Sequence, residues 1–328
     1  MTDELALAAF AAQRDAHPRV EERTARFAAF ARRFDANAYI AALGRRGFRW
    51  LGRADPAFPR LLHAVHDAPS GLFLRGNGDP ALLARPAVAI VGARACSPYG
   101  AHVARLLGRE LAAAGLVVVS GLARGVDAEA HRGALEARRA TVAVLGCGID
   151  RDYPAAHASL AAQIAEAGLL VSEYAPGVEP APWRFPARNR IVAGLCAATV
   201  VVEARERSGA LITADFALEE GRDVFACPGE ITSALSEGTN ALLRIGATPL
   251  TRTEDVLEAF GIEPSAAETP DVSPAAQTLL ARLEAPMSVD ELVLAAGTNA
   301  AATAVALSEL ELAALVTQAD GVYRRSAT

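Results

Sequence analysis

The sequence predicts an α/β fold: an extended Rossmann-like, doubly wound and mostly parallel sheet, with an N-terminal helical domain and a C-terminal winged-helix domain. From Ala87 onward, short continuous apolar runs alternate with alanine-rich stretches of helical periodicity. Continuous apolar runs are typical of parallel strands that are buried on both faces, and their alternation with helices predicts a layered α/β sheet. The runs expected to form strands are Val88 to Val91, Leu116 to Val119, Thr141 to Leu145, Leu169 to Ser172, Thr199 to Val202 and Val224 to Ala226.

Residues 1–80 are expected to form the N-terminal helical domain, of the SAM-like type, and a lead-in to the sheet. Phe27 and Phe30 recur at helical spacing, and a second helical stretch begins at Tyr39 and ends at Gly44. Prolines and glycines punctuate the remainder, which favours an extended lead-in.

Two further segments follow the Rossmann-like domain, which is expected over residues 81–260. Residues 261–274 are rich in Pro, Ala, Ser and acidic residues and are expected to be a linker. In residues 275–328, three helical stretches precede a pair of strand-like runs, which is the outline of a winged helix. The helical stretches are Ala275 to Leu283, Val289 to Ala295 and Asn299 to Leu312, and the strand-like runs are Leu315 to Gln318 and Gly321 to Arg324.

The composition excludes several classes of protein. All 32 basic residues are arginine, which excludes a catalytic lysine and a Walker lysine. The 4 cysteines are widely spaced without a C-x-x-C pair, so neither a disulfide framework nor a thiolate zinc site is expected. No apolar stretch could span a bilayer, and the start lacks the basic region of a signal peptide. We therefore expect a cytoplasmic protein without membrane contact, and the net charge of −6 restricts any nucleic-acid site to a local patch.

The segment from Trp183 to Arg190 combines arginines, two aromatic residues and an asparagine immediately before an apolar run. Guanidinium groups match phosphate oxygens, and aromatic rings offer faces on which bases stack, so the segment predicts a nucleic acid or nucleotide as ligand. Arg188 is expected to clamp a phosphate, and Phe185 or Trp183 to stack on a base. Asn189 is expected either to bond a base edge or to fix the loop.

Glycine-rich loops follow four of the expected strands, at the edge of the sheet where helix N-termini collect anions. In the first loop, Gly92 permits close approach of the backbone, Arg94 supplies a phosphate fork and Ser97 is suited to cap the next helix. In the fourth, Ser208 and Gly209 are expected to form a backbone anion nest. The loops are Gly92 to Gly100, Ser120 to Asp127, Gly146 to Pro154 and Arg205 to Thr213.

Two sets of residues leave a catalytic alternative open. Asp127 and His131 lie one helical turn apart. They are either an acid/base pair or an Asp in the first turn of a helix that is hydrogen-bonded to the His. Glu203, at the end of an expected strand, is either a catalytic carboxylate or the partner that orients a nearby arginine. No nucleophile elbow or metal-ligand spacing accompanies these residues.

Short motifs follow one another along the chain in a fixed order. They are Val88 to Arg94, Ser120 to His131, Val144 to Gly148, Tyr153 with Pro154, Ser172 to Tyr174, Phe185 to Arg190, Val202 to Ala204, Ser208 with Gly209, Thr213 with Ala214, Pro228 with Gly229, and Gly238 to Asn240. In order and spacing they resemble the motifs of the DNA-processing protein A family (DprA, also called Smf). The resemblance extends from about Pro56 to Leu250, and the terminal winged helix agrees with it.

The resemblance implies a DNA-binding protein rather than an enzyme. It implies a homodimer that holds single-stranded DNA, protects incoming strands and helps load the RecA recombinase during natural transformation and recombination. No catalytic residue, metal or cofactor is implied. The residues expected to bind DNA, from the resemblance and from the loops together, are Gly92, Arg94, Ser120, Gly121, Trp183, Phe185, Arg188, Asn189, Arg190, Ser208 and Gly209.

Two regions depart from the family pattern. Residues 1–80 lack a clear helix-hairpin-helix glycine pattern, which argues against a DNA-binding role there. The expected recognition helix, Asn299 to Leu312, contains no arginine and is poorly suited to a phosphate-lined groove. We therefore expect the winged helix to serve packing or a partner protein.

The alternative function is a Rossmann-like nucleotide phosphoribohydrolase, in which Glu203 or Glu230 would assist glycosidic cleavage. Against it, Pro228 and Gly229 are followed by Glu230 instead of a compact Gly-Gly-x-Gly-Thr turn. A dinucleotide-dependent oxidoreductase would need an intact glycine fingerprint, but Arg151 occupies the place of its last glycine.

Overall fold

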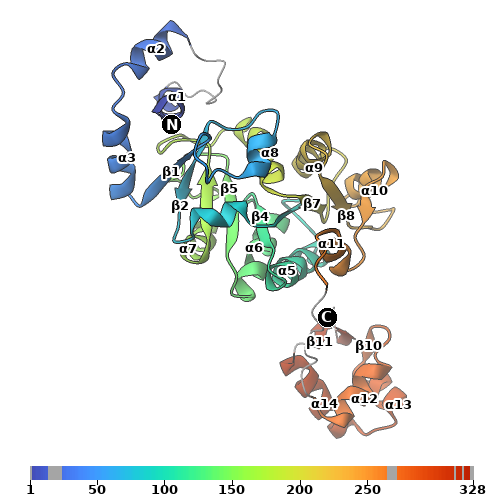
Figure 1. Ribbon diagram of the computed structural model, residues 1–328. Helices are drawn as coiled ribbons and strands as arrows, with labels where there is room; N and C mark the ends of the chain where they lie inside the picture. Colours follow the sequence, from blue (N-terminus) through green and yellow to red (C-terminus); the bar gives the residue numbers. More distant parts are fainter. Residues whose placement is uncertain (1, 14–23, 264–271, 314, 320, 326–328) are drawn as a thin grey trace. The chain divides into compact units, whose positions relative to one another are not determined.

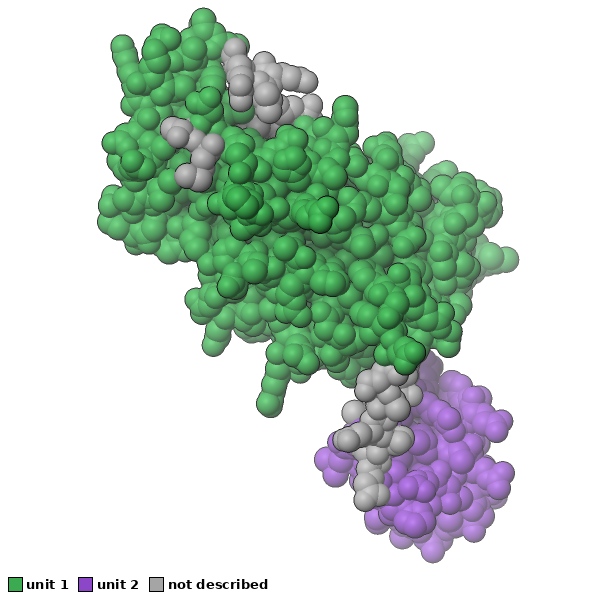
Figure 2. Space-filling model, in the orientation of Figure 1, with its two compact units in different colours: residues 1–263 green, residues 264–328 purple. Residues whose placement is uncertain are grey.

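The computed structural model describes residues 2–13, 24–263, 272–313, 315–319 and 321–325. The chain divides into two compact units, residues 1–263 and residues 264–328 (Figure 2). Most of the linker predicted at 261–274 falls on residues 264–271, which lie outside the described residues.

Within the described part of the larger unit, nine strands form one sheet (Figure 1). They are β1 (Phe48–Gly52), β2 (Gly71–Arg75), β3 (Ala87–Val91), β4 (Val117–Ser120), β5 (Thr141–Leu145), β6 (Leu169–Ser172), β7 (Ala198–Val201), β8 (Asp223–Ala226) and β9 (Thr248–Pro249). Their order is β1-β2-β6-β5-β4-β3-β7-β8-β9. The pairs from β6 to β9 are parallel, whereas β2 pairs antiparallel with both β6 and β1. The predicted doubly wound, mostly parallel sheet is therefore confirmed.

Helices cover both faces of this sheet. They are α4 (Arg60–Ala64), α5 (Pro98–Ala113), α6 (Val126–Glu136), α7 (Ala158–Ala167), α8 (Arg184–Leu195), α9 (Gly209–Glu219), α10 (Glu237–Arg244) and α11 (Glu254–Ala259), with the short 3-10 helices η2 (Pro80–Ala84) and η3 (Ala155–His157). Helices α4, α8, α9 and α10 pack on one face, and α5, α6, α7 and α11 pack on the other.

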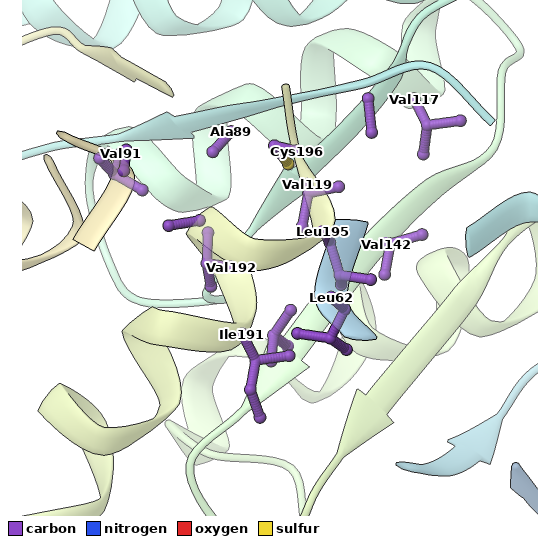
Figure 3. Packing of buried hydrophobic residues seen from close by; sticks show 14 of the residues in the cluster. Leu62, Ala89, Val91, Val117, Val119, Val142, Ile191, Val192, Leu195 and Cys196 are labelled. Atoms are coloured by element: carbon purple, nitrogen blue, oxygen red, sulfur yellow. The ribbon is translucent and has the colours of Figure 1, made fainter. Parts of the chain in front are cut away.

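The continuous apolar runs follow from this two-sided burial, because successive residues of a strand point to opposite faces. Ala89 and Val91 of β3 lie in the cluster that contains Ile191 of α8, as Figure 3 shows. Val88 and Ile90, which alternate with them along β3, are fully buried in the cluster under α5 and α6. Full burial of each such side chain stabilises the fold by about 1.5–3 kcal/mol, so both faces favour apolar residues.

The strand order creates a crevice at one point of the sheet. The chain runs from β3 outward through β4, β5 and β6, and then returns to place β7 on the other side of β3. The loops that follow β3 and β7 therefore diverge to opposite faces at the carboxyl edge of the sheet. Such a switch point is where open α/β sheets bind their ligands.

The N-terminal segment contributes helices α1 (Thr2–Gln13), α2 (Ala25–Ala31) and α3 (Ala36–Arg45). The side chains of Thr24 and Asp35 cap α2 and α3 by accepting hydrogen bonds from backbone N–H groups. The lead-in predicted as merely extended contains β1 and β2, which widen the sheet beyond β6. The side chains of Trp50, on β1, and Phe73, on β2, pack with their ring centroids 4.6 Å apart.

The smaller unit has the predicted winged-helix elements. Helices α12 (Pro274–Arg282), α13 (Val289–Ala296) and α14 (Ala300–Leu312) precede the hairpin of β11 (Val316–Ala319) and β12 (Val322–Arg325), and β10 (Met287–Ser288) pairs with β12. Ser288 and Glu291 form a capping box at the start of α13. Among the described residues, no single helix is long and apolar enough to cross a membrane, and α13 and α14 pass that test only jointly, across a bend of 107°.

Candidate nucleic-acid interface

A hollow of about 330 Å³ lies at the switch point between β3 and β7. It is enclosed by the loop after β3, the loop after β4, the first turns of α8 and the loop that leads into α9. The lining residues that the sequence also predicted are Gly92, Arg94, Gly121, Phe185, Arg188, Asn189, Ser208 and Gly209. The fold thus brings together residues from four separated segments of the chain.

Three exposed arginines line this hollow: Arg94, Arg205 and Arg207. Among the described residues, none of the three has a carboxylate within salt-bridge distance. The lining contains one carboxylate, that of Asp127, which is buried below the surface. The mouth of the hollow is therefore a concentrated positive patch on a chain with a net charge of −6.

An aromatic ring forms one wall of the hollow. Phe185, in the first turn of α8, is half-buried, and the Arg94 guanidinium carbon lies 5.4 Å from its ring centroid. On the same ring, Tyr153 stacks with a centroid separation of 5.3 Å and an interplanar angle of 24°. Gly146 leaves room for Phe185, because a Cβ there would lie 2.8 Å from the ring. The third glycine loop thus supports the aromatic wall.

Arg188 lies in the floor of the hollow and is 4% exposed. Its guanidinium donates to the carbonyl oxygens of Gly121, at 2.6 Å, and Val144. Burial lowers the pKa of Arg188, and the nearby carboxylate of Asp127 opposes that shift. The same burial raises the pKa of Asp127, which the Arg188 charge opposes. Arg188 therefore ties the loop after β4 to β5, and its charge is balanced from within the protein.

Two residues set the geometry of the α9 side. The Asn189 amide donates to the carbonyl oxygen of Gly209 at 2.9 Å and accepts from Arg188 Nε at 3.2 Å. Of the two roles expected for Asn189, these bonds favour fixing the loop. Ser208 caps α9 by accepting from the Ala210 N–H at 3.3 Å. The N-terminus of this 11-residue helix thus opens beside the hollow, where its backbone N–H groups favour an anion.

Gly92 is required by close packing behind the hollow. A Cβ at this position would lie 2.7 Å from Val126 Cγ2 and 3.0 Å from the Glu203 carbonyl oxygen. The next residue, Ala93, donates its N–H to that same oxygen at 2.7 Å. The loop after β3 is therefore held against the end of β7, and this contact positions Arg94 at the rim.

Three predicted residues lie outside the hollow. Ser120 is fully buried and donates its hydroxyl to the Ile90 carbonyl oxygen at 2.6 Å. Arg190 is 5% exposed and pairs with Glu173 at 2.5 Å. Trp183 is 44% exposed, and the Arg184 guanidinium carbon lies 4.7 Å from its ring centroid.

The acid/base alternatives have different partners from those expected. His131 Nδ1 pairs with Thr141 Oγ1 at 2.8 Å, while Asp127 accepts from the Ala123 N–H at 3.2 Å, so the predicted Asp–His bond is wrong. The Glu203 carboxylate accepts from the N–H and hydroxyl of Ser97, so its predicted pairing with an arginine is also wrong. Asp127 and Glu203 therefore hold loop or helix termini: Asp127 accepts from a backbone N–H, and Glu203 accepts from both the N–H and the hydroxyl of the helix cap Ser97.

The sequence analysis did not select Arg205 and Arg207, which line the hollow, or Tyr153, which stacks on its aromatic wall. The two arginines lie in the fourth glycine loop, and their place directly after a strand at the switch point is the signal that would have selected them. Tyr153 lies 32 positions before Phe185, and nothing in the local sequence indicates that the two rings stack. Within the described residues, no group of three His, Cys, Asp or Glu side chains could hold a metal ion.

Comparison with protein families decides the assignment. The family model for DNA recombination-mediator protein A matches residues 49–261, and the model for the DprA winged helix domain matches residues 263–322. The chain belongs to the DNA-processing protein A (DprA/Smf) family. The hollow, the strands around it and the switch point all lie within the first matched region of this DprA/Smf family member.

Individual relatives agree with this assignment. The DNA processing protein DprA of Streptococcus pneumoniae is 48% identical over 206 residues, which cover 63% of this chain and 72% of the relative. Protein Smf of Escherichia coli is 41% identical over 281 residues, which cover 82% of this chain and 75% of the relative.

Two solved DprA structures share the fold. The Streptococcus pneumoniae structure aligns with a TM-score of 0.66 and 39% identity, over 78% of this chain and 92% of that one. The Helicobacter pylori protein, whose structure was described for its single-stranded DNA binding mode, aligns with a TM-score of 0.59 and 32% identity, over 65% of this chain and 95% of that one.

Proposed function

We propose that this chain binds single-stranded DNA in the hollow between β3 and β7. The observation that carries the proposal is the set of exposed guanidinium groups of Arg94, Arg205 and Arg207, none of which has a carboxylate partner among the described residues, around one hollow with an aromatic wall. Three positive groups gathered around one hollow favour an anionic ligand. The aromatic wall favours an anion that carries a planar base. The Helicobacter pylori relative, described for its single-stranded DNA binding, supports the same class of ligand.

The contacts predict binding without base-sequence preference. Guanidinium groups and the N–H groups at the start of α9 contact phosphates, and phosphate contacts position a strand without reading its sequence. A base stacks on an aromatic face whatever its identity. In a duplex the base faces are stacked on one another and cannot reach the Phe185 wall. We therefore expect a preference for single strands over duplexes.

The direct contacts assigned in this proposal are Arg94, Arg205, Arg207 and the backbone at Ser208 and Gly209. Arg188, Asn189 and Gly121 have a different part, because their polar groups already bond one another or the surrounding backbone. They shape the floor and fix the two loops. Ser120, Trp183 and Arg190 are placed outside the contact surface, since none of them lines the hollow.

Membership of the family supports a proposal for the cellular role. We propose that the protein acts in the cytoplasm as a homodimer, protects incoming single strands and helps load RecA onto them during transformation and recombination. The matching family description, a recombination mediator, supports this role. Two linked pockets would raise avidity along one strand. The test is RecA filament assembly on strands coated with single-strand-binding protein: the chain should shorten the lag, and an unchanged lag would contradict the loading role.

Fluorescence anisotropy tests the binding proposal directly. A labelled oligo-dT strand and a matching duplex are titrated with the protein at two salt concentrations. We expect tighter binding to the single strand and an affinity that falls with salt, because phosphate contacts release counterions. Equal or absent binding to both would overturn the proposal.

The same preparation tests the hydrolase alternative. Nucleoside monophosphates are incubated with the protein, and release of free base is followed. The Glu203 carboxylate is held by Ser97 and is 6% exposed. We therefore expect no release, and base release that disappears in Glu203→Gln would establish the hydrolase instead.

A further inference from the structure

We propose a second nucleobase subsite on the exposed ring of Tyr153, one nucleotide beyond the hollow. This inference rests on the proposed single-strand binding and adds a contact that neither the sequence nor the family match assigned. Tyr153 does not line the hollow, but its ring stacks on Phe185, which does. It is 44% exposed.

The Phe185 ring already has several close neighbours. Tyr153 stacks on it at 5.3 Å between centroids, and the Arg94 guanidinium carbon lies 5.4 Å from the same centroid. The Gly146 backbone approaches the ring as well, since a Cβ at Gly146 would lie 2.8 Å from Phe185 Cδ1. A first base stacks on Phe185 by displacing the exposed Arg94 guanidinium from the ring. The aromatic surface that is left open to a second base is that of Tyr153.

The size of the hollow requires such a continuation. About 330 Å³ lies at the lower end of the range of ligand pockets, which suits one nucleotide and not several. A strand that enters the hollow must leave it over the rim. The stack of Phe185 and Tyr153 extends from the wall of the hollow to the surface, so it provides an aromatic path for the adjacent base.

The charges around Tyr153 permit this path. Its two acidic neighbours have arginine partners: Asp152 pairs with Arg75, and Asp150 pairs with Arg46 at 2.9 Å. Arg151, two positions before Tyr153, pairs with Glu179 at 2.5 Å. No unpaired carboxylate among these neighbours would repel a passing phosphate. The site is thus aromatic and nearly neutral, which suits a base, whereas the hollow is positive, which suits phosphates.

The test is a cycle that combines two changes, one in the protein and one in the DNA. Tyr153→Ala is compared with wild type for binding to oligo-dT and to an abasic strand of the same length and charge. Stacking on one aromatic ring contributes about 1–3 kcal/mol per base, so Tyr153→Ala should weaken oligo-dT binding by about 5- to 150-fold. The abasic strand should bind both proteins equally, because it has no base to stack.

Two further variants separate stacking from packing. Tyr153→Phe keeps the aromatic plane and should bind oligo-dT as wild type does. Tyr153→Leu keeps an apolar side chain without a plane and should lose affinity as Tyr153→Ala does. Thermal melting of each variant confirms that it is folded. Equal oligo-dT affinity for wild type and Tyr153→Leu would overturn the second subsite.

Failure of this subsite is distinguishable from failure of the proposed function. If wild type binds oligo-dT and Arg94→Ala does not, the hollow is the binding site whatever Tyr153 does. If Tyr153→Ala then binds normally, only the subsite is wrong. If wild type itself binds no strand, both the function and the subsite are wrong.

Discussion

The Glu203 carboxylate accepts two hydrogen bonds from Ser97, one from its N–H at 2.8 Å and one from its hydroxyl at 2.5 Å. Ser97 in turn caps α5 by accepting from the Gly100 N–H at 3.0 Å. This relationship joins the end of β7 to the loop after β3. It therefore fixes the distance between the two arginine-bearing sides of the hollow.

Replacement of Glu203 should separate these sides. In Glu203→Ala the partly buried donors of Ser97 lose their acceptor, which costs at most about 1–3 kcal/mol of unfolding free energy. The loop with Arg94 loses its anchor, so single-strand affinity should fall as well. Glu203→Gln keeps one acceptor oxygen, so its stability and its single-strand affinity should lie between those of wild type and Glu203→Ala. Urea unfolding and anisotropy measure both effects, and a Glu203→Ala protein with unchanged stability and affinity would contradict this role.

The salt dependence of binding should report Arg205 and Arg207. Each phosphate contact on a single strand contributes about 0.7 to the slope of log K against log salt. Arg207→Ala and Arg205→Ala should each lower that slope by about this amount. The matched control is Arg139→Ala, because Arg139 is exposed but precedes β5 at the opposite edge of the sheet. A slope unchanged in both hollow variants would refute their phosphate contacts.

Two glycines of the hollow should respond oppositely to alanine. A Cβ at Gly121 would overlap the buried Arg188 guanidinium, so Gly121→Ala should destabilise the fold and weaken binding. A Cβ at Gly209 meets nothing within 4 Å, so Gly209→Ala should leave thermal stability unchanged or slightly higher. Thermal melting of the two variants checks this. A Gly121→Ala protein as stable as wild type would show that Arg188 is free to move.

His131 should make stability depend on pH below neutrality. Burial lowers its pKa to about 3, and Nε2 has no hydrogen-bond partner among the described residues. Between pH 6.5 and about 3 the unfolded chain binds a proton that the folded chain does not. The contribution of neutral His131 to the free energy of unfolding is therefore fully present above the unfolded pKa. It is lost as pH falls, by up to about 1.4 kcal/mol per pH unit.

The measurement compares urea unfolding of wild type and His131→Met at neutral pH and at about pH 5. His131→Met removes the titrating ring, so its stability should fall less steeply with acid. The difference between the two slopes isolates the contribution of His131 from those of other titrating groups. Identical slopes would contradict the burial of a neutral His131.

The winged-helix unit should be dispensable for strand binding. Helix α14 contains no arginine, and its exposed side chains include Val305 and Leu312, at 70% and 91% exposure. These do not suit a phosphate-lined groove. A chain that ends at Glu263 should bind oligo-dT with the affinity of the full chain. A large loss on truncation would assign DNA contact to the smaller unit.

The sequence predicted those features that depend on local pattern. Two-sided burial requires apolar residues at successive positions, so the strands from Val88 to Ala226 were recognisable. Caps such as Ser97 and the three helices of the winged helix also follow from local signals. The strand pair β1 and β2 was not recognised, because a short run such as Leu72 to Leu74 does not indicate which strand it will join.

The site was predictable in its segments but not in its contacts. The glycine loops and the segment after Trp183 do meet at the switch point, as the strand order requires. Which arginines face the solvent depends on tertiary packing, and that packing buries Arg188 and Arg190 while it exposes Arg205 and Arg207. Stacking of Tyr153 on Phe185 joins two loops that have no local relation in the sequence.

The most direct test of the account is the oligo-dT affinity of Arg94→Ala measured beside Arg139→Ala. Both variants remove one exposed arginine and change the net charge equally, but only Arg94 lies at the hollow. Hydrogen bonds to charged groups contribute about 1.5–3 kcal/mol, so Arg94→Ala should bind about tenfold or more weakly while Arg139→Ala binds as wild type does. Equal affinities for the two variants, with both proteins folded, would contradict the placement of the DNA site at the β3–β7 switch point.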